Sequence, residues 1–228
     1  VTLAENLDRR SLLGALRAFG ERLNDNSVAV LYYAGHGLQL RDRNYLIPVD
    51  AEIRSEDEIA LAGIDVAFIL GRMSAARSRI NIVIIDACRN NPFAPSTGKS
   101  AHTAQGLAQM DAPVGSLVAF ATALGSVAHD GQRANGFYTH HLLKALQEPN
   151  VKVEDVFKRV RAAVLAESAG KQVPWESTSL LGDFYFRGGP AAQRVAAAGP
   201  QPARRVATLV LPSSRGETAA FGPQDRAF

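Results

Sequence analysis

The stretch "NIVIIDACRNNPF", residues 81–93, is the part of the sequence that indicates the fold most directly. Together with Ile80 it forms a continuous apolar run that leads to Asp86 and then to Cys88, the single cysteine of this 228-residue chain. A short apolar run without polar alternation is typical of a parallel strand that is covered on both faces. The sequence therefore places a carboxylate and a thiol where a buried strand ends and a polar turn begins.

Around this strand, segments with strand-like and helix-like patterns alternate along the chain. Leu12, Leu16 and Phe19 recur at helical spacing after a cap at Asn6 or Asp8, for example. We expect strands over residues 27–33, 44–49, 80–86, 115–123 and 179–186, and helices over 9–23, 64–76 (entered through Asp65), 136–146 and 153–167. Strands that alternate with helices predict an α/β fold with a largely parallel sheet.

The composition changes after residue 186. Residues 1–186 read as one domain, whereas residues 187–228 are rich in Ala, Pro and Arg and are predicted to be a linker or tail. Within that tail, "VATLVLP" (206–212) has the pattern of a strand, but the sequence does not specify which sheet edge it would join. Residues 94–114 are predicted to form a long loop.

The charge distribution and the lack of long apolar runs exclude several classes of function. The net charge is +3, but the tail from Arg187 on holds six arginines and two acidic residues, so the predicted domain carries no excess of basic residues. We therefore expect neither nucleic-acid binding nor, without an apolar run of membrane-spanning length, a membrane protein. The sequence leaves the compartment open; because no signal peptide is visible, the cytoplasm is the default expectation.

A second apolar strand, "VAVLYYAGHGL" (28–38), is predicted to end at His36 in a glycine-bearing turn. Because the carboxyl ends of parallel strands lie at one edge of a sheet, His36 and Cys88 would meet there if the two strands are neighbours. A cysteine and a histidine are the minimum for thiol nucleophilic catalysis. The glycines at 35 and 37 leave room for a substrate, and the amides of Gly37 and Cys88 are candidate donors to an oxyanion.

Each of these residues also has a simpler interpretation. A lone cysteine is more often a buried apolar residue, and a lone histidine in a glycine-rich stretch is more often part of a turn. Asp86 would in that case cap the turn that follows its strand. The pattern as a whole, and not any single residue, favours the catalytic interpretation.

The motifs together resemble those of caspase-like cysteine peptidases, in particular the bacterial paracaspase and metacaspase type. The resemblance covers roughly residues 1–186 and is carried by "LYYAGHG" (31–37), "YLIPVDA" (45–51), "IIDACRNNPF" (84–93), "FATALGSVAHDG" (120–131) and "NGFYTHHLLKAL" (135–146). The interval between His36 and Cys88 is also close to the roughly 50 residues of caspases. The resemblance implies a caspase–haemoglobinase fold with helices on both faces of a mostly parallel sheet. It also implies His36 as the proton-transfer residue, Cys88 as the nucleophile, and the amides of Gly37 and Cys88 as the oxyanion hole.

The residue two positions before the nucleophile indicates the substrate. In caspases this position is Gln, whereas here it is Asp86, as in paracaspases and metacaspases, which are similar in cleaving after basic residues. A carboxylate favours a cationic substrate side chain, and Arg best of all, because it pairs in a bidentate fork. Matching the 120–131 segment to the paracaspase pattern makes Asp130 a second acidic pocket residue; the alternative is that Asp130 is a solvated loop residue. We expect a peptidase that cuts after Arg or Lys and needs no cofactor or metal.

Further expectations concern processing and partners. Relatives begin with a strand and a helix ahead of the segment that matches "VTLAENLD", so we expect the domain to lack both and to expose a sheet edge. The substrate is expected to add a strand along the sheet near residues 119–125, and the protein to be a monomer or homodimer. Candidate self-cleavage sites are basic residues in the long loop and the tail: Lys99, Arg194, Arg204, Arg205 and Arg215.

Two other functions are alternatives to the peptidase. One is a catalytically silent caspase-like scaffold that binds partner proteins or peptides, which the presence of both His36 and Cys88 disfavours. The other is a small-molecule α/β hydrolase, which the absence of a G-x-S-x-G turn disfavours.

Overall fold

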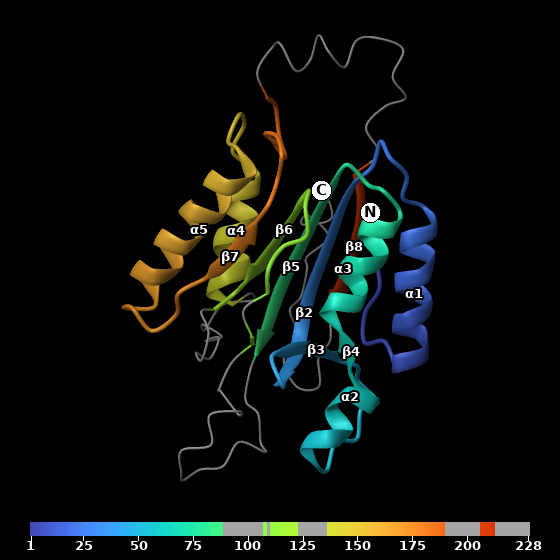
Figure 1. Ribbon diagram of the computed structural model, residues 1–228. Coiled ribbons are helices and arrows are strands. Elements are labelled where there is room, and N and C mark those ends of the chain that lie inside the picture. The colour runs from blue at the N-terminus through green and yellow to red at the C-terminus, as the bar shows by residue number, and fades with distance from the viewer. Residues whose placement is uncertain (89–106, 109, 123–135, 190–205, 213–228) are drawn as a thin grey trace.

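The computed structural model describes residues 1–88, 107–108, 110–122, 136–189 and 206–212 (Figure 1). In chain order, its elements are β1 (Thr2–Leu3), α1 (Arg9–Glu21), β2 (Val28–Leu40), β3 (Arg43–Ile47), the 3-10 helix η1 (Glu56–Glu58), α2 (Ile59–Ala62), β4 (Ile64–Asp65), α3 (Val66–Ala75), β5 (Ile80–Cys88), β6 (Ser116–Phe120), α4 (Phe137–Leu146), α5 (Val153–Glu167), β7 (Trp175–Thr178) and β8 (Val206–Pro212).

The strands form one eight-stranded sheet in the order β1-β8-β2-β5-β6-β7, with β3 paired to β2 and β4 paired to β3. The four pairings from β1 through β8, β2 and β5 to β6 are parallel, and β7 closes the path antiparallel to β6. The predicted α/β class with a mostly parallel sheet is confirmed.

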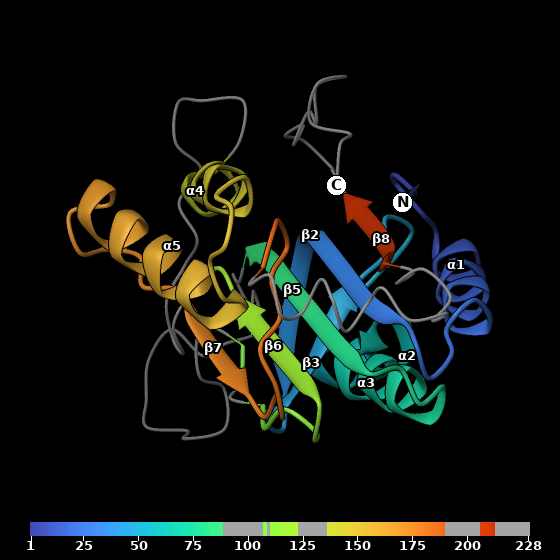
Figure 2. The same ribbon diagram turned by 90° about the horizontal axis from the view of Figure 1, so that it is seen from above.

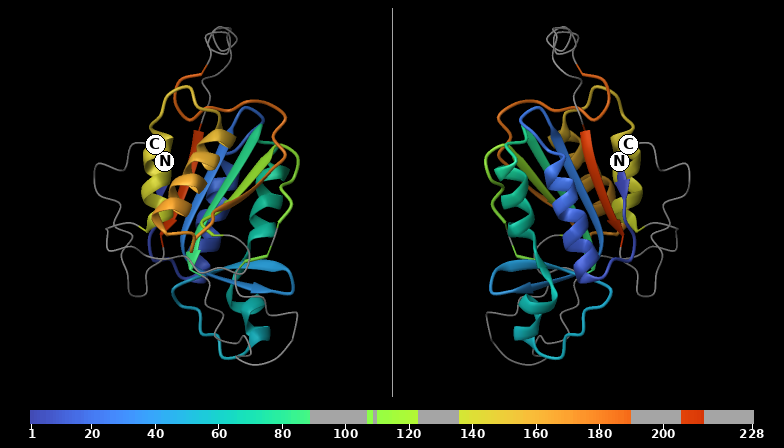
Figure 3. Two further views of the ribbon diagram at one scale, coloured as in Figure 1. Left: turned by 90° about the vertical axis from the view of Figure 1, so that its left-hand side faces the viewer. Right: turned by 90° about the vertical axis from the view of Figure 1, so that its right-hand side faces the viewer.

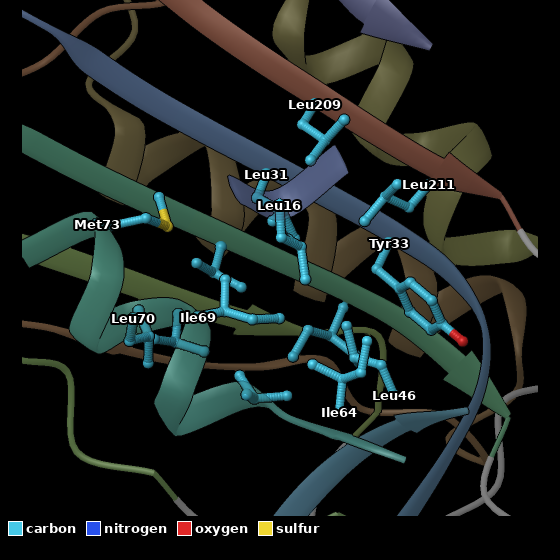
Figure 4. Close-up of a cluster of buried hydrophobic side chains, with 14 of the residues drawn as sticks. Leu16, Leu31, Tyr33, Leu46, Ile64, Ile69, Leu70, Met73, Leu209 and Leu211 are labelled. Atoms are coloured by element: carbon cyan, nitrogen blue, oxygen red, sulfur yellow. The ribbon is translucent and has the colours of Figure 1, made fainter. Parts of the chain in front are cut away.

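Helices cover both faces of this sheet, with α1 and α3 on one side and α4 and α5 on the other (Figures 2 and 3). Because side chains alternate along a strand, Leu31 and Tyr33 of β2 face the α1/α3 layer, whereas Val30 and Tyr32 face the α4/α5 layer. Figure 4 shows how side chains from α1, α3, β2 and β8 meet in the first of these cores: Leu16, Leu31, Tyr33, Ile69, Leu70, Met73, Leu209 and Leu211.

Two of the helices, α1 and α3, begin at capping aspartates that the sequence predicted. Of the two candidates for the cap of α1, Asp8 is the residue that accepts a hydrogen bond from the Ser11 amide, at 2.7 Å. That contact lowers the pKa of Asp8, because the amide dipole stabilises the carboxylate. Asp65 caps α3 in the same way through the Ala67 amide, at 2.8 Å.

The predicted final strand over residues 179–186 is wrong. The last strand of that region is β7, which ends at Thr178, and the only bridge in the predicted segment is an isolated one between Lys152 and Tyr185. The apolar residues of the segment serve a different purpose: Phe184 is buried in the α4/α5 core, and its carbonyl accepts a hydrogen bond from the Val153 amide at the start of α5 (2.8 Å).

Strand β2 is longer than predicted, and the glycine-bearing turn expected at residues 35–37 is part of it. Residues 28–36 pair with β5, and residues 28–34 pair with β8 on the other side. Residues 36–40 form an antiparallel hairpin with β3, and Arg41 and Asp42 make the turn of that hairpin. Arg41 and Asp42 both have positive φ values, 48° and 59°, as the twist of a tight hairpin requires. Figure 3 shows this hairpin lying across the end of the sheet.

Strand β8 bears on two further expectations. Residues 187–228 were predicted to be a linker or tail, but residues 206–212 of this segment form β8, which lies between β1 and β2 and is parallel to both. The edge of β2 along Val28–Ala34 is therefore paired and not exposed. The physical reason is apolar burial: Leu209 and Leu211 face the α1/α3 core, and Val210 faces the opposite core. The strand predicted for "VATLVLP" is confirmed. Its position between β1 and β2 was not predicted.

Candidate active site

The candidate site lies where the parallel part of β2 meets the end of β5. The two strands are direct neighbours, and their register pairs the Cα of His36 with the Cα of Cys88. His36 is exposed to solvent, although Val28–Ala34 at the start of β2 are buried. The condition set by the sequence, that the two strands adjoin, is therefore met.

Tyr33 fixes the backbone at His36 from the other face of the sheet. Its ring is buried in the α1/α3 core, and its hydroxyl lies 2.8 Å from the carbonyl oxygen of His36 and 3.1 Å from that of Ile47. His36 and Ile47 are register partners in the β2–β3 hairpin. The Tyr33 hydroxyl thus holds together the two strands at the point where β2 leaves the sheet, which orients the backbone that carries His36.

Gly37 is tightly packed, so a side chain at this position would need its neighbours to shift. A Cβ atom at this position would lie 3.0 Å from the Cβ of Ala87 and 3.4 Å from Cδ2 of Leu107. The Leu107 segment is itself held in place, because the side-chain amide of Asn44 donates to the carbonyl of Ala108 (2.9 Å) and accepts from its amide (2.6 Å). This two-bond contact fixes residues 107–108 beside the backbone of Gly37.

Asp86 lies two residues before Cys88 on β5 and is half-buried. Its Oδ2 atom accepts a hydrogen bond from the hydroxyl of Thr139 on α4, and the hydroxyl of Tyr32 lies 3.4 Å from the same oxygen. Tyr32 and Thr139 also contact each other, with 2.6 Å between their oxygens. Burial, followed by the charge of Asp86, raises the pKa of Tyr32 well above its ordinary value, so the phenol stays protonated.

A second tyrosine, Tyr138, faces the same region. It is fully buried, and its hydroxyl has no hydrogen-bond partner among the residues that the structure describes. Burial raises its pKa well above the ordinary value, and the charges of Asp86 and Glu176 raise it further. Asp86 is therefore bordered by aromatic hydroxyls, which sequence reasoning did not identify.

Some of the predicted site residues lie outside the described residues: Asp130 and the candidate self-cleavage sites Lys99, Arg194, Arg204, Arg205 and Arg215. The predicted docking edge near residues 119–125 is wrong for Ala119 and Phe120, because β6 lies between β5 and β7 and both residues are paired on either side. Residues 123–125 lie outside the described residues. Within the described ranges there is no cluster of three or more potential metal ligands. None of the described helices has the length and apolar character needed to cross a membrane.

Comparison with known proteins agrees with the observed fold. The caspase domain family matches residues 1–185. The chain belongs to the caspase domain family. The crystal structure of caspase-1 from Spodoptera frugiperda is similar in fold, with a TM-score of 0.56 and 15% identity, over 82% of this chain and 76% of that one. No curated protein sequence matches the chain. Membership of this peptidase family implies cysteine peptidase activity on protein or peptide substrates.

Proposed function

We propose that this caspase-family chain is a cysteine endopeptidase that hydrolyses peptide bonds after Arg, and less readily after Lys. The observation that carries the proposal is the register of β2 on β5, which pairs His36 with Cys88 where the parallel pairing of the two strands ends. Asp86 stands two residues before Cys88 at the same edge, where it adds a negative charge to the region that a substrate would occupy.

In the proposed reaction, the thiolate of Cys88 attacks the carbonyl carbon of the residue before the cut bond. A carbon–sulfur bond forms, and the negative charge that develops on the carbonyl oxygen is stabilised by the amides of Gly37 and Cys88. The carbon–nitrogen bond then breaks as His36, in its protonated form, gives a proton to the leaving amine. Water then attacks the acyl carbon while the now neutral His36 takes a proton from that water. The carbon–sulfur bond breaks, the carboxylic acid product leaves, and the Cys88 thiolate is regenerated beside protonated His36.

Substrate choice in this proposal follows from charge. The Asp86 carboxylate attracts a guanidinium or ammonium group and repels a carboxylate, so a substrate with Asp before the cut bond would bring two like charges together. Arg pairs better than Lys because its planar fork can bind both oxygens of one carboxylate. Asp130 is proposed as a second acidic group on the basis of the sequence resemblance alone.

The direct test uses four fluorogenic peptides that differ only in the residue before the cut bond: Arg, Lys, citrulline and Asp. We expect turnover in the order Arg, then Lys, with citrulline and Asp far below, and loss of all turnover in Cys88→Ala and in His36→Ala. Cleavage that persists in Cys88→Ala, or a preference for Asp, would contradict the proposal. No turnover by the wild type, combined with tight peptide binding, would favour the silent scaffold.

Self-processing is tested separately by intact-mass measurement. Purified wild type and Cys88→Ala are incubated under the same conditions, and fragments ending at Lys99, Arg194, Arg204, Arg205 or Arg215 are sought. Fragments that occur only in the wild type support self-cleavage. Identical fragments in both proteins point to a contaminating protease, and the self-cleavage part of the proposal is then abandoned.

A further inference from the structure

Three elements that are far apart in sequence contribute to one group of hydroxyls around Asp86. Tyr32 comes from β2, Asp86 from β5 and Thr139 from α4, and the last two are 53 residues apart. Tyr32 and Thr139 are buried, whereas Asp86 is only half-buried. Asp86 can therefore meet a ligand on one side while the two hydroxyls hold it from the protein side.

The directions of the hydrogen bonds follow from the number of protons available. An ionised carboxylate only accepts, so Thr139 uses its single proton in the bond to Oδ2 of Asp86. In the 2.6 Å contact between the two hydroxyls, Tyr32 must then be the donor and Thr139 the acceptor. The arrangement is a chain from Tyr32 to Thr139 to Asp86, and it is complete only while Tyr32 is protonated.

We propose that Tyr32 and Thr139 are positioning residues for substrate selectivity, which hold the carboxylate of Asp86 in the orientation that binds a cationic substrate side chain. This inference rests on the proposed function. A carboxylate on a short side chain can rotate about its terminal bond, and a bidentate pair with a guanidinium requires one orientation. Thr139 fixes that orientation directly, and Tyr32 does so through its bond to Thr139, before the substrate arrives, so binding loses less conformational entropy.

The proposal gives α4 a part in the active site. The helix carries no residue of the proposed Cys–His pair, yet Thr139 in its first turn is the direct donor to Asp86. A shift of α4 along its axis would break this contact while leaving the β2–β5 register intact. Selectivity and catalysis are thus held by different elements and can be separated by mutation.

The test compares Thr139→Val and Tyr32→Phe with wild type on the Arg and citrulline peptides. Valine has nearly the shape of threonine, and phenylalanine that of tyrosine, so each change removes only the hydroxyl. We expect kcat/KM for the Arg peptide to fall about tenfold, mainly through KM, because a hydrogen bond to a charged group is lost. The value for the citrulline peptide should stay unchanged. Thr139→Ser, which retains the hydroxyl, should keep the wild-type ratio of the two peptides.

Ser116→Ala is the matched control for hydroxyl removal. The Ser116 hydroxyl is buried and has no hydrogen-bond partner among the described residues, so its loss should leave the Arg-to-citrulline ratio unchanged. Thermal unfolding of each variant checks that it is folded. If Thr139→Val and Tyr32→Phe leave the ratio of kcat/KM for the Arg peptide to that for the citrulline peptide at its wild-type value, the positioning role is refuted and the proposed function stands. If the wild type itself does not prefer Arg over citrulline, both proposals are overturned.

Discussion

At the residue scale, two adjacent tyrosines serve the candidate site from opposite faces of one strand. Tyr32 faces the α4/α5 layer and contacts the group around Asp86, whereas Tyr33 faces the α1/α3 layer and contacts the carbonyl oxygen of His36. The alternation of side chains along β2 produces this division. The "YY" of the motif therefore connects Asp86, the proposed substrate-binding residue, to one core and His36, the proposed proton-transfer residue, to the other.

Tyr33→Phe should impair catalysis more than binding. Without the hydroxyl, the carbonyl oxygens of His36 and Ile47 lose a shared donor, and the backbone under His36 can shift. Small misplacements of catalytic groups are costly, so we expect kcat to fall about 10- to 100-fold with KM for the Arg peptide little changed. Tyr185→Phe, whose hydroxyl contacts only Asp183 at 3.4 Å among the contacts described, is the control and should leave both constants unchanged. A Tyr33→Phe enzyme with wild-type kcat would disprove the role.

Removal of the Tyr138 hydroxyl should not destabilise the protein. A buried hydroxyl without a partner costs desolvation and returns nothing, so the free energy of unfolding of Tyr138→Phe should equal that of wild type or exceed it by up to about 1 kcal/mol. Tyr32→Phe, by contrast, removes a hydrogen-bonded hydroxyl and should lower the free energy of unfolding by about 1–2 kcal/mol. Urea unfolding of both variants measures the difference. The opposite ranking would show that Tyr138 has a partner.

Tyr32 and Tyr138 should make the stability of the protein depend on pH above about pH 10. The pKa values of Tyr32 and Tyr138 are raised above the value near 10 that tyrosine has in an unfolded chain, because burial disfavours the phenolate. Above that pH the unfolded chain releases protons that the folded chain retains. This contribution to stability is therefore fully present below pH 10 and is lost as the pH rises further. Urea unfolding at pH 9 and pH 11 should show the decrease, and the Tyr32→Phe/Tyr138→Phe double variant should show a smaller one.

The sequence was sufficient to predict the positions of residues that are set by the strand carrying them. His36, Asp86 and Cys88 follow strongly apolar segments, and the parallel pairing of β2 with β5 brings them together where that pairing ends. Thr139 and Tyr32 were not identified, because their contact depends on where α4 packs against the sheet. They are 107 residues apart, and no spacing rule relates them.

At the element scale, helices were predicted more accurately than strands. The pattern of α1 and α5 lies within a single segment, and a side-chain cap such as Asp8 marks the start locally. Strands depend on partners elsewhere: β2 continues past His36 because β3 is available to pair with its second half. The segment 179–186 has a strand-like sequence but packs on α4 and α5, where its apolar residues are buried without forming a ladder.

Asp65→Ala should destabilise the start of α3. The side chain accepts the Ala67 amide at 2.8 Å and pairs with Arg43 at 3.2 Å, and loss of a helix cap typically lowers the free energy of unfolding by about 1 kcal/mol. Asp65→Asn is the matched control: it keeps an oxygen to accept the amide but removes the charge, so it should cost less. Chemical denaturation of the three proteins gives the comparison. Equal losses in both variants would assign the effect to the ion pair instead of the cap.

At the scale of the whole molecule, the sheet depends on a strand that composition assigned to a linker. Chains that end at residue 205 lack β8, and β2 then loses a parallel partner along Val28–Ala34 together with the buried Leu209 and Leu211. We expect such a chain to lose the cooperative unfolding of the wild type and the amide protection of β2. A chain that ends at residue 212 keeps β8 and should retain both. If the shorter chain keeps protected β2 amides and peptidase activity, β8 is dispensable.

The position of β8 also bears on when the protein can become active in the cell. On the ribosome, β2 is made roughly 180 residues before the strand that lies beside it, an interval of about 10–35 s at ordinary elongation rates. During that time His36 and Cys88 can already stand on paired strands, but the sheet between β1 and β2 is incomplete. A nascent peptidase of this topology would therefore complete its sheet only after nearly all of this sequence has left the exit tunnel, which delays the appearance of proteolytic activity beside the translation machinery.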